Sequence, residues 1–448
     1  MEARQRRLLE ESSCWCNSLL WSISMVIQQH LPTLKKALSE LPDNRARKSY
    51  KIEELVFAAI MLYVLKNETR HGLNQKRKTG KFKKNYERCF KMRLPHMDTV
   101  TDVLEELPVE FLEKISLQLV KQLLKKRLFH RFKLLGKYFL IAIDATGYAS
   151  YTKAPNWPCP HKTSKNGKTW WTQPILCAKL VFPNGLCLPL FTEWIINEIE
   201  YDKQDCETKA FKRLAPRIKT AFPRLAICIV ADGLYTTGPF FDICKQQHWA
   251  FMVVFKDTQL QTVWAQVQCQ QEQQEVEKYE DQETLSEKII QYKSFKWTSG
   301  LVYQTHILNW VEGKIEDQEI VKGNPPCFNK HRFVSLTNLP VEKETVEQII
   351  QAGRLRWKIE NEGFNTQKNG GYKLKHKMSR TNFLAVQNFM TCLQIGHLIN
   401  QLIACSDYFK QHLKQGFTLK HCWFSINAFL QYGQVENPPM SNFAFRYT

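Results

Sequence analysis

Residues 138–148 read YFLIAIDATGY, a short and almost continuous apolar run that ends in Asp144 and a glycine turn. A run of this length and composition, bounded by turn residues, predicts a buried β-strand. Residues 224–235, RLAICIVADGLY, repeat the pattern, with an apolar run that closes on Asp232 before a glycine. Two buried strands that each end in a carboxylate predict a core with acidic residues at the ends of its strands.

The segments around these two strands alternate between strand and helix patterns. Strand-like residues 174–183 and 186–196 are separated by Asn184-Gly185, the strongest two-residue hairpin signal. Helical patterns follow at 205–222 and 238–247, and another strand pattern lies at 249–256. This alternation predicts an α/β core over residues 137–256.

Residues 257–325 have a different character. A Gln/Glu-rich run precedes the strand-like pieces SFKWTSG and VYQTHILNWV, and a Gly-Asn-Pro-Pro break stands at 323–326. We therefore expect a β-rich insertion at 257–325. The α/β pattern resumes with the strand-like HRFVSLTNL and a long helix from Val346 through about Asn365, so the core is expected to continue over 326–400.

Both ends of the chain have helical patterns. Apolar residues recur at three- and four-residue spacing in IEELVFAAIMLYVL and FLEKISLQLVKQLLKKRLF, which predicts a helical domain over residues 1–130. Residues 401–448 are expected to form a further helical region. No apolar run approaches the roughly 20 residues that a membrane-spanning helix needs, so no membrane association is expected.

The charge balance predicts an acidic partner. The chain has 63 Lys and Arg against 43 Asp and Glu, a net charge of +20. Without a membrane segment, nucleic acid is the expected partner. Residues 66–93 carry eleven basic and two acidic residues, interleaved with Phe82, Tyr86 and Phe90. A solvated helix surface is the ordinary interpretation; the density and the aromatic residues favour a DNA-binding surface that contacts phosphates, with candidates Lys76, Lys81 and Lys84.

A third acidic residue, Glu360, lies on the basic segment RWKIENEGF. Buried carboxylates are costly unless they are paired or bind a metal. Three that converge would form the hard-oxygen site that Mg²⁺ prefers, and two such ions can promote displacement at phosphorus. Each residue alone has a simpler interpretation, because Asp144 and Asp232 could cap turns and Glu360 could pair with Arg356. All three together in a strongly basic chain favour the metal site.

With this strand–strand–helix setting, Asp144, Asp232 and Glu360 resemble the DDE triad of bacterial insertion-sequence transposases. Residues 353–376, GRLRWKIENEGFNTQKNGGYKLKH, look like the signature helix of the group named for insertion sequence four, in which Tyr, Arg, Glu and Lys recur at fixed spacing. The stretches KQDCE (203–207) and LPHMDTV (94–100) are also similar to that group.

The match to the signature helix has two departures. Arg356 and Glu360 match, but Gly353 stands in the Tyr position, and Gln367 stands in the Lys position with Lys368 one residue later. On an ideal helix Lys368 lies roughly 80° away from Glu360. It is therefore expected to serve only if the helix unwinds near the glycines at 370–371.

The resemblance implies a ribonuclease-H-like core and a DNA endonuclease and strand transferase that performs cut-and-paste DNA transposition. It implies two Mg²⁺ ions, with Mn²⁺ as a substitute, bound by Asp144, Asp232 and Glu360. The implied partners are the double-stranded DNA of the transposon ends and of the target, bound by a homodimer. The implied location is the cytoplasm of a bacterium, associated with the nucleoid.

The resemblance also gives roles to other side chains. Phosphates near the scissile bond would be neutralised by Arg354, Arg356, Lys358 and Lys368. An aromatic residue of the insertion would hold a flipped base, with candidates Trp297, Trp310 and Trp264; the alternative is that each fills a small hydrophobic core.

Two other functions are compatible with such a chain. One is a catalytically silent DNA-binding regulator derived from a transposase, and the other is a ribonuclease-H-like nuclease. The presence of all three carboxylates argues against the first. The helical N-terminal domain and the insertion argue against the second, because a plain nuclease needs neither.

Overall fold

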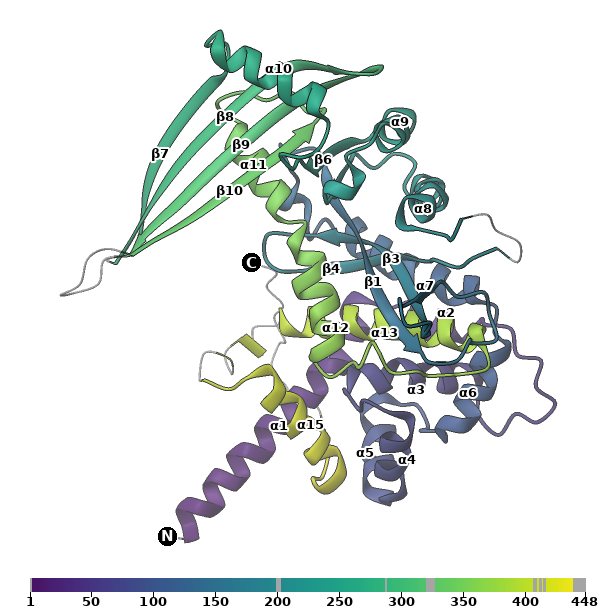
Figure 1. Ribbon diagram of the computed structural model, residues 1–448. Helices are drawn as coiled ribbons and strands as arrows, with labels where there is room; N and C mark the ends of the chain where they lie inside the picture. The colour runs from purple at the N-terminus through teal and green to yellow at the C-terminus, as the bar shows by residue number, and fades with distance from the viewer. Residues whose placement is uncertain are drawn as a thin grey trace.

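The computed structural model describes residues 2–198, 203–286, 288–319, 327–405, 409–410, 413 and 416–437, with side chains from residue 15 onward. One mixed sheet runs through the molecule, and helices pack on it and beside it (Figure 1). The prediction of a mixed α/β protein is therefore confirmed.

The first part of the sheet contains the two strands that carry the aspartates. Its strands are β1 (Phe139–Tyr151), β2 (His161–Thr163), β3 (Thr169–Val181), β4 (Cys187–Trp194), β5 (Ile227–Ala231) and β6 (Ala250–Val254). The strands β1, β3 and β4 pair antiparallel, whereas β5 pairs parallel with β1 and β6 parallel with β5. The resulting order is β4-β3-β1-β5-β6.

The sheet continues without a break into four long strands that we call the blade: β7 (Glu277–Ser286), β8 (Ile289–Tyr303), β9 (His306–Glu319) and β10 (Cys327–Thr337). Only the last residues of β10 pair with β6, while its whole length pairs with β9. Helix α10 (Gln261–Glu272) packs against β8 of the blade (Figure 1). The region expected to be β-rich thus also contains a helix. Its Gly-Asn-Pro-Pro break lies outside the described residues.

Seven helices precede the sheet: α1 (Glu2–His30), α2 (Leu34–Ser39), α3 (Ile52–Val64), α4 (Arg70–Lys78), α5 (Gly80–Phe90), α6 (Met97–Glu106) and α7 (Val109–Lys125), followed by the short η1 (His130–Phe132). Helix α13 (Phe383–Ala404) packs against α3, α6 and α7. Gly396 allows the close approach, because a Cβ there would lie 2.8 Å from the Cβ of Tyr63. Segments from the two ends of the chain therefore share one helical core.

The remaining helices lie beside the strands or near the C-terminus: α8 (Glu207–Ala221), η2 (Gly233–Tyr235), α9 (Gly238–Gln247), α11 (Val346–Arg354), η3 (Ile359–Asn365), α12 (Thr366–Asn369) and α15 (Leu419–Tyr432). In the part of the chain that the structure describes, no helix has the length and apolar character needed to cross a membrane. Residues 438–448 of the expected C-terminal helical region lie outside the described residues.

The structure corrects the prediction of one long helix from Val346 to about Asn365. Helix α11 ends at Arg354, a turn follows, and residues Ile359–Asn365 form a π-helix that leads into α12. A π-helix bonds each residue to the fifth along instead of the fourth, and it is often found at functional sites. The interruption falls on the segment that carries Glu360.

The structure also corrects the interpretation of the aromatic residues in the basic stretch. Phe82, Tyr86 and Phe90 are each at most 1% exposed, and all three lie on the inner face of α5. Their spacing of four residues is that of one helix face. They build the helical core and offer no surface to DNA bases.

Candidate functional site

Strand pairing brings the two aspartates together. The parallel register of β1 and β5 runs from Phe139 opposite Ile227 to Ala142 opposite Val230. Asp144 and Asp232 each lie two residues beyond the last pair of this register, at the same end of the two neighbouring strands. Asp144 and Asp232 are 88 positions apart in the sequence, and the pairing of β1 with β5 brings their strands side by side.

Both aspartates make local hydrogen bonds of the kind that a turn cap makes. The Asp144 Oδ1 atom accepts a hydrogen bond from the backbone N–H of Ala145 at 2.9 Å. The Asp232 Oδ1 atom accepts one from the N–H of Leu234 at 2.8 Å and caps η2. Each carboxylate keeps its second oxygen for other partners, so capping does not exclude a role in a site.

The third carboxylate, Glu360, comes from the π-helix η3. Its side chain is exposed, and within the described residues it makes no hydrogen bond or ion pair. The expected Arg356–Glu360 pair is not among these contacts. Instead, the Arg356 Nη1 atom lies 3.6 Å from Asp144 Oδ2, and the arginine is only 7% exposed.

The surroundings of Asp144 shift its pKa. Burial raises the pKa of Asp144 to about 6; the Arg356 guanidinium opposes this rise, and the charges of Asp232 and Glu360 add to it. Like charges near a carboxylate disfavour its ionised form. The charges of Asp232 and Glu360 therefore act on Asp144, and the convergence of the three carboxylates on a common ion stays a prediction.

The π-helix explains the displaced lysine of the signature. An α-helix that contains a π-helical segment accommodates an extra residue, so the residue eight positions after Glu360 takes the place of the seventh. Gln367, the seventh, is fully buried and donates to Gln394 Oε1 at 2.8 Å. Burial lowers the pKa of Lys368, and the nearby charges of Glu360 and Asp144 raise it. The expectation was that the helix would unwind near the glycines at 370–371. Instead, the helix widens at the π-helical segment before Gln367, and Lys368 lies near the carboxylates.

The donor set fits a divalent metal ion in chemical type, since carboxylate oxygens are the ligands that Mg²⁺ prefers. In the described part of the chain, however, no three His, Cys, Asp or Glu side chains are close enough to hold an ion. Asp144 has Arg356 as its charge partner in this arrangement. Binding of a metal would require the side chains to turn toward a common point.

A fourth carboxylate near the site was missed in the sequence. Burial raises the pKa of Glu207 to about 7, and the charges of Asp144 and Asp232 add to the rise. Glu207 is the first residue of α8, where an acidic residue is common because its negative charge interacts favourably with the positive end of the helix dipole. Only the similarity of KQDCE to transposase sequences pointed to this segment.

The other residues predicted in the signature segment have separate partners. Arg354 lies over the ring of Phe333 at 4.6 Å, and Lys358 forms an ion pair with Glu362 at 2.6 Å. The neighbouring Trp357 is 50% exposed, with the Arg356 guanidinium 4.9 Å from its ring centre. This exposed aromatic residue beside the site was not singled out from the sequence.

The three lysines proposed for DNA binding differ in their surroundings. Lys76 is half-buried and donates to Asn67 Oδ1 at 2.6 Å and to Asn427 Oδ1 at 2.8 Å, which ties α4 to α15. The Lys81 ammonium donates to the carbonyl of Tyr432 at 2.7 Å, and Lys84 is exposed. Of the three, Lys84 is the most available to a phosphate.

The three tryptophans proposed to hold a flipped base lie in the core of the blade or against it. Trp297 and Trp310 are each 1% exposed. Trp264 on α10 stacks on Phe255, with ring centres 4.7 Å apart and an interplanar angle of 10°. This burial corrects the expectation for Trp297 and Trp310 and favours the alternative that they fill a small hydrophobic core.

Comparison with known protein families gives a match. Residues 199–395, just under half of the chain, match the sequence model of a family described as the transposase DDE domain. The matched region contains Asp232 and Glu360 and begins downstream of Asp144. A search among curated proteins finds no match to this chain. The match supports a DDE transposase and agrees with two of the three carboxylates.

Proposed function

We propose that this protein is a transposase that cuts DNA at the ends of a mobile element and joins those ends to target DNA. The observation that carries the proposal is the match of residues 199–395, which include Asp232 and Glu360, to the DDE family, together with Asp144 on the strand beside β5. By its signature segment, the protein would fall in the group named for insertion sequence four.

The sheet supports a ribonuclease-H-like catalytic core. Three antiparallel strands, β4, β3 and β1, are followed by β5 and β6 in parallel with β1. This order places β1 and β5 next to each other inside the sheet. Asp232 directly follows the end of β5, whereas β1 runs on to Tyr151, so Asp144 lies in the middle of its strand and not at the expected strand end. We propose residues 137–256 and 326–400 as this core, 257–325 as its insertion, and 1–130 and 401–448 as flanking helical regions.

The three carboxylates would hold two Mg²⁺ ions, or Mn²⁺ in their place. When bound, such ions supply a nucleophile at neutral pH and stabilise charge on the reacting phosphate. Asp144 would contribute from the centre of the sheet, with Asp232 beside it and Glu360 from the π-helix. Arg356 and Lys368 bring positive charge to the same place, where they would bind phosphate oxygens of the DNA.

The proposed partner is double-stranded DNA. The net charge of +20 supports binding to phosphates over a broad surface. Cutting two ends and joining them in one step needs two active sites, so we propose a homodimer on DNA. Two free subunits with this charge repel, and the DNA would cancel the repulsion.

Of the alternatives, a catalytically silent regulator is not favoured, because all three carboxylates are present in the sequence. A nuclease without strand transfer would share the same cluster. Such a nuclease would cut the DNA but would not join the cut ends to a target.

The test is an in vitro reaction with linear DNA that carries the element's own ends, together with a supercoiled target plasmid. With Mg²⁺, the protein should cut at the ends and produce joined target products; without a divalent ion, it should bind DNA and cut nothing. Cleavage without joining would indicate a nuclease. An absence of cleavage with both Mg²⁺ and Mn²⁺ would contradict the proposal.

A further inference from the structure

A lysine of β3, Lys179, is buried in the sheet region. It is 1% exposed, and its Nζ atom has no hydrogen-bond partner among the described residues. Lysine is almost never fully buried unless it is paired. A buried charge without a partner costs stability, so the presence of this ammonium needs an explanation.

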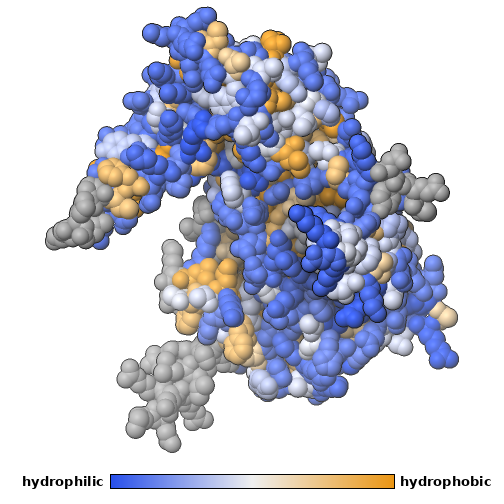
Figure 2. Space-filling model, in the orientation of Figure 1, coloured by the Kyte–Doolittle hydropathy of each residue, from blue (hydrophilic) through white to orange (hydrophobic). Residues whose placement is uncertain are grey.

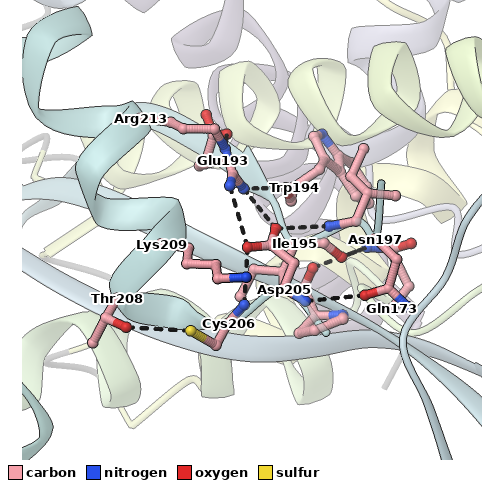
Figure 3. A network of polar contacts seen from close by, with 12 residues as sticks. Gln173, Glu193, Trp194, Ile195, Asn197, Asp205, Cys206, Thr208, Lys209 and Arg213 are labelled. Atoms are coloured by element: carbon pink, nitrogen blue, oxygen red, sulfur yellow. Dashed lines mark hydrogen bonds and ion pairs between the residues drawn. The ribbon is translucent and has the colours of Figure 1, made fainter. Parts of the chain in front are cut away.

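Other charged side chains beside these strands are paired. Figure 3 shows a network at the end of β4 in which the Arg213 guanidinium donates to Glu193 Oε1 and to Asp205 Oδ2, both at 2.7 Å. Both carboxylate side chains are largely shielded from solvent, and the arginine compensates their charges. Lys179 has no such bonds in the described structure, although its strand also pairs with β4.

The register of the sheet places Lys179 close to Asp144. In the antiparallel pairing of β1 with β3, Lys179 stands opposite Ala142, and Cys177 stands opposite Asp144. Residues directly opposite each other lie on one face of a sheet, and so do residues two apart along a strand. Lys179 and Asp144 therefore lie on the same face as diagonal neighbours, a spacing that a long side chain can reach across.

The same ammonium lies against the π-helix η3. Its Nζ atom is 5.2 Å from the ring centre of Phe364. A Cβ on Gly363 would lie 3.2 Å from this Nζ atom, closer than such contacts usually are, so the glycine permits the close approach. Because Glu360 belongs to the same π-helix, Lys179 joins the strand beside Asp144 to the segment that carries the third carboxylate.

Phe364 also connects Lys179 with the displaced lysine of the signature segment. Phe364 is 2% exposed, and the Nζ atom of Lys368 lies 5.8 Å from its ring centre. Both ammonium groups are thus within about 6 Å of one aromatic ring, the range in which a ring attracts a cation. The attraction is stronger when the cation is desolvated, as the buried Lys179 is.

We propose that Lys179 is a positioning residue of the candidate site, whose buried ammonium holds Phe364 and the π-helix against β3. It thereby fixes Glu360 and Lys368 relative to Asp144. The inference rests on the proposed function and deepens it. Since a buried ammonium without a bonded partner lowers stability, this lysine serves activity at the expense of the fold.

The test is Lys179→Met, which removes the charge and keeps a long apolar side chain. In the full-length protein it should raise the denaturant concentration at the midpoint of unfolding, because the buried charge is lost. In single-turnover cleavage of end DNA with Mg²⁺ and saturating protein, it should lower the rate about tenfold or more, because the reacting groups are misplaced. Lys133→Met is the control: the Lys133 Nζ atom also lies 5.2 Å from a ring centre, that of Phe139 at the start of β1. It should cleave as the original protein does.

Hydrogen exchange of the backbone amides of residues 359–369 follows the π-helix without DNA or metal. Lys179→Met should speed exchange of this segment about tenfold and leave the helices before β1 unchanged. Phe364→Leu, which removes the ring and keeps an apolar side chain, should act in the same way. Combining the two changes should add little, because both remove the same contact.

The outcomes separate this inference from the proposed function. If the original protein cuts end DNA and Lys179→Met cuts it equally fast, Lys179 is not a positioning residue. If Lys179→Met lowers stability and cleavage together, the lysine serves the fold, which also contradicts the inference. If the original protein cuts no DNA with Mg²⁺ or Mn²⁺ while exchange at 359–369 still responds to Lys179→Met, the proposed function is contradicted and the role of Lys179 in holding the π-helix stands.

Discussion

The basic stretch from Lys66 to Arg93 and the segment from Arg354 to Lys368 are both rich in positive charge, yet they use it differently. In the first, Lys66 lies between the rings of Tyr372 and Trp423, and Arg93 pairs with Glu54 at 2.7 Å. In the second, Arg356 and Lys368 lie near the carboxylates of the candidate site.

This comparison shows that charge density along a sequence does not tell what the charges do. Several basic residues of the first stretch bind carbonyls, asparagines or aromatic rings of the protein, so they join α4 and α5 to neighbouring elements. In the second segment, Arg356 and Lys368 lie near the carboxylates, whereas Arg354 and Lys358 have other partners. The surface of the molecule is nonetheless hydrophilic over most of the face seen in Figure 2. Binding of DNA would depend on the lysines left exposed there and elsewhere.

The largest effect should come from the second segment, and two glutamates of the π-helix give a matched pair. Glu360→Gln should reduce DNA cleavage by about 10³-fold or more, because a metal site contributes several kcal/mol to the transition state. Glu362→Gln, two residues away and paired with Lys358, should retain most activity. Single-turnover cleavage of end DNA measures both. Equal losses in the two variants would contradict the assignment of Glu360.

The next effect tests the register set by the π-helix. Lys368→Ala should lower cleavage by about 10- to 100-fold with little change in stability, since it removes a charge near the scissile phosphate. Gln367→Ala should instead destabilise the fold by about 1–3 kcal/mol, because it leaves the buried Gln394 without its partner. Cleavage rates and chemical denaturation of both variants decide between them. If Gln367→Ala lowers cleavage without loss of stability while Lys368→Ala leaves cleavage unchanged, Gln367 holds the signature position.

A smaller effect is expected in the first stretch. Lys84→Glu should weaken binding of DNA and flatten the dependence of log affinity on log salt by about 0.9 for the lost phosphate contact. Lys76→Met should leave that slope almost unchanged and lower the melting temperature, because its ammonium joins two asparagines. Fluorescence anisotropy over a salt series checks both. If only Lys76→Met flattens the slope, Lys76 and not Lys84 contacts a DNA phosphate.

The smallest effect concerns pH and stability without metal. Folding raises the pKa of Asp144 to about 6 and of Glu207 to about 7, so the folded state binds protons more tightly than the unfolded state. Stability should therefore fall as pH rises from about 4 to about 7. After allowance for solvent screening, Asp144→Asn or Glu207→Gln should each gain about 1 kcal/mol at pH 8 and nothing at pH 4. Denaturation at the two pH values tests this, and a gain that is equal at both would contradict it.

The strands were predictable because their signals are local. The apolar runs before Asp144 and Asp232 appear as β1 and β5, and the Asn184-Gly185 turn joins β3 to β4. The family resemblance supplied what local patterns do not, namely that residues from two strands and a helix belong together. The pairing register then explains how the two aspartates meet.

What the sequence did not reveal depends on packing between distant segments. The π-helix shows in the sequence only as the one-residue offset of Lys368, and the burial of Gln367 beside α13 becomes visible only in three dimensions. Glu207 resembles any acidic residue at a helix start. The alternation of charge and aromatic residues in α5 has the same period as a helix with one buried face, so it did not distinguish a core from a DNA surface.

The central claim is that Asp144, Asp232 and Glu360 form one cation-dependent site. The most direct measurement is anomalous scattering from crystals of the full-length protein soaked in Mn²⁺, with Asp144→Asn crystals treated in the same way. The account predicts a Mn²⁺ peak bounded by Asp144 and Asp232 that is absent from the variant. Mn²⁺ bound only away from these carboxylates, or the same peak in the Asp144→Asn crystals, would contradict it.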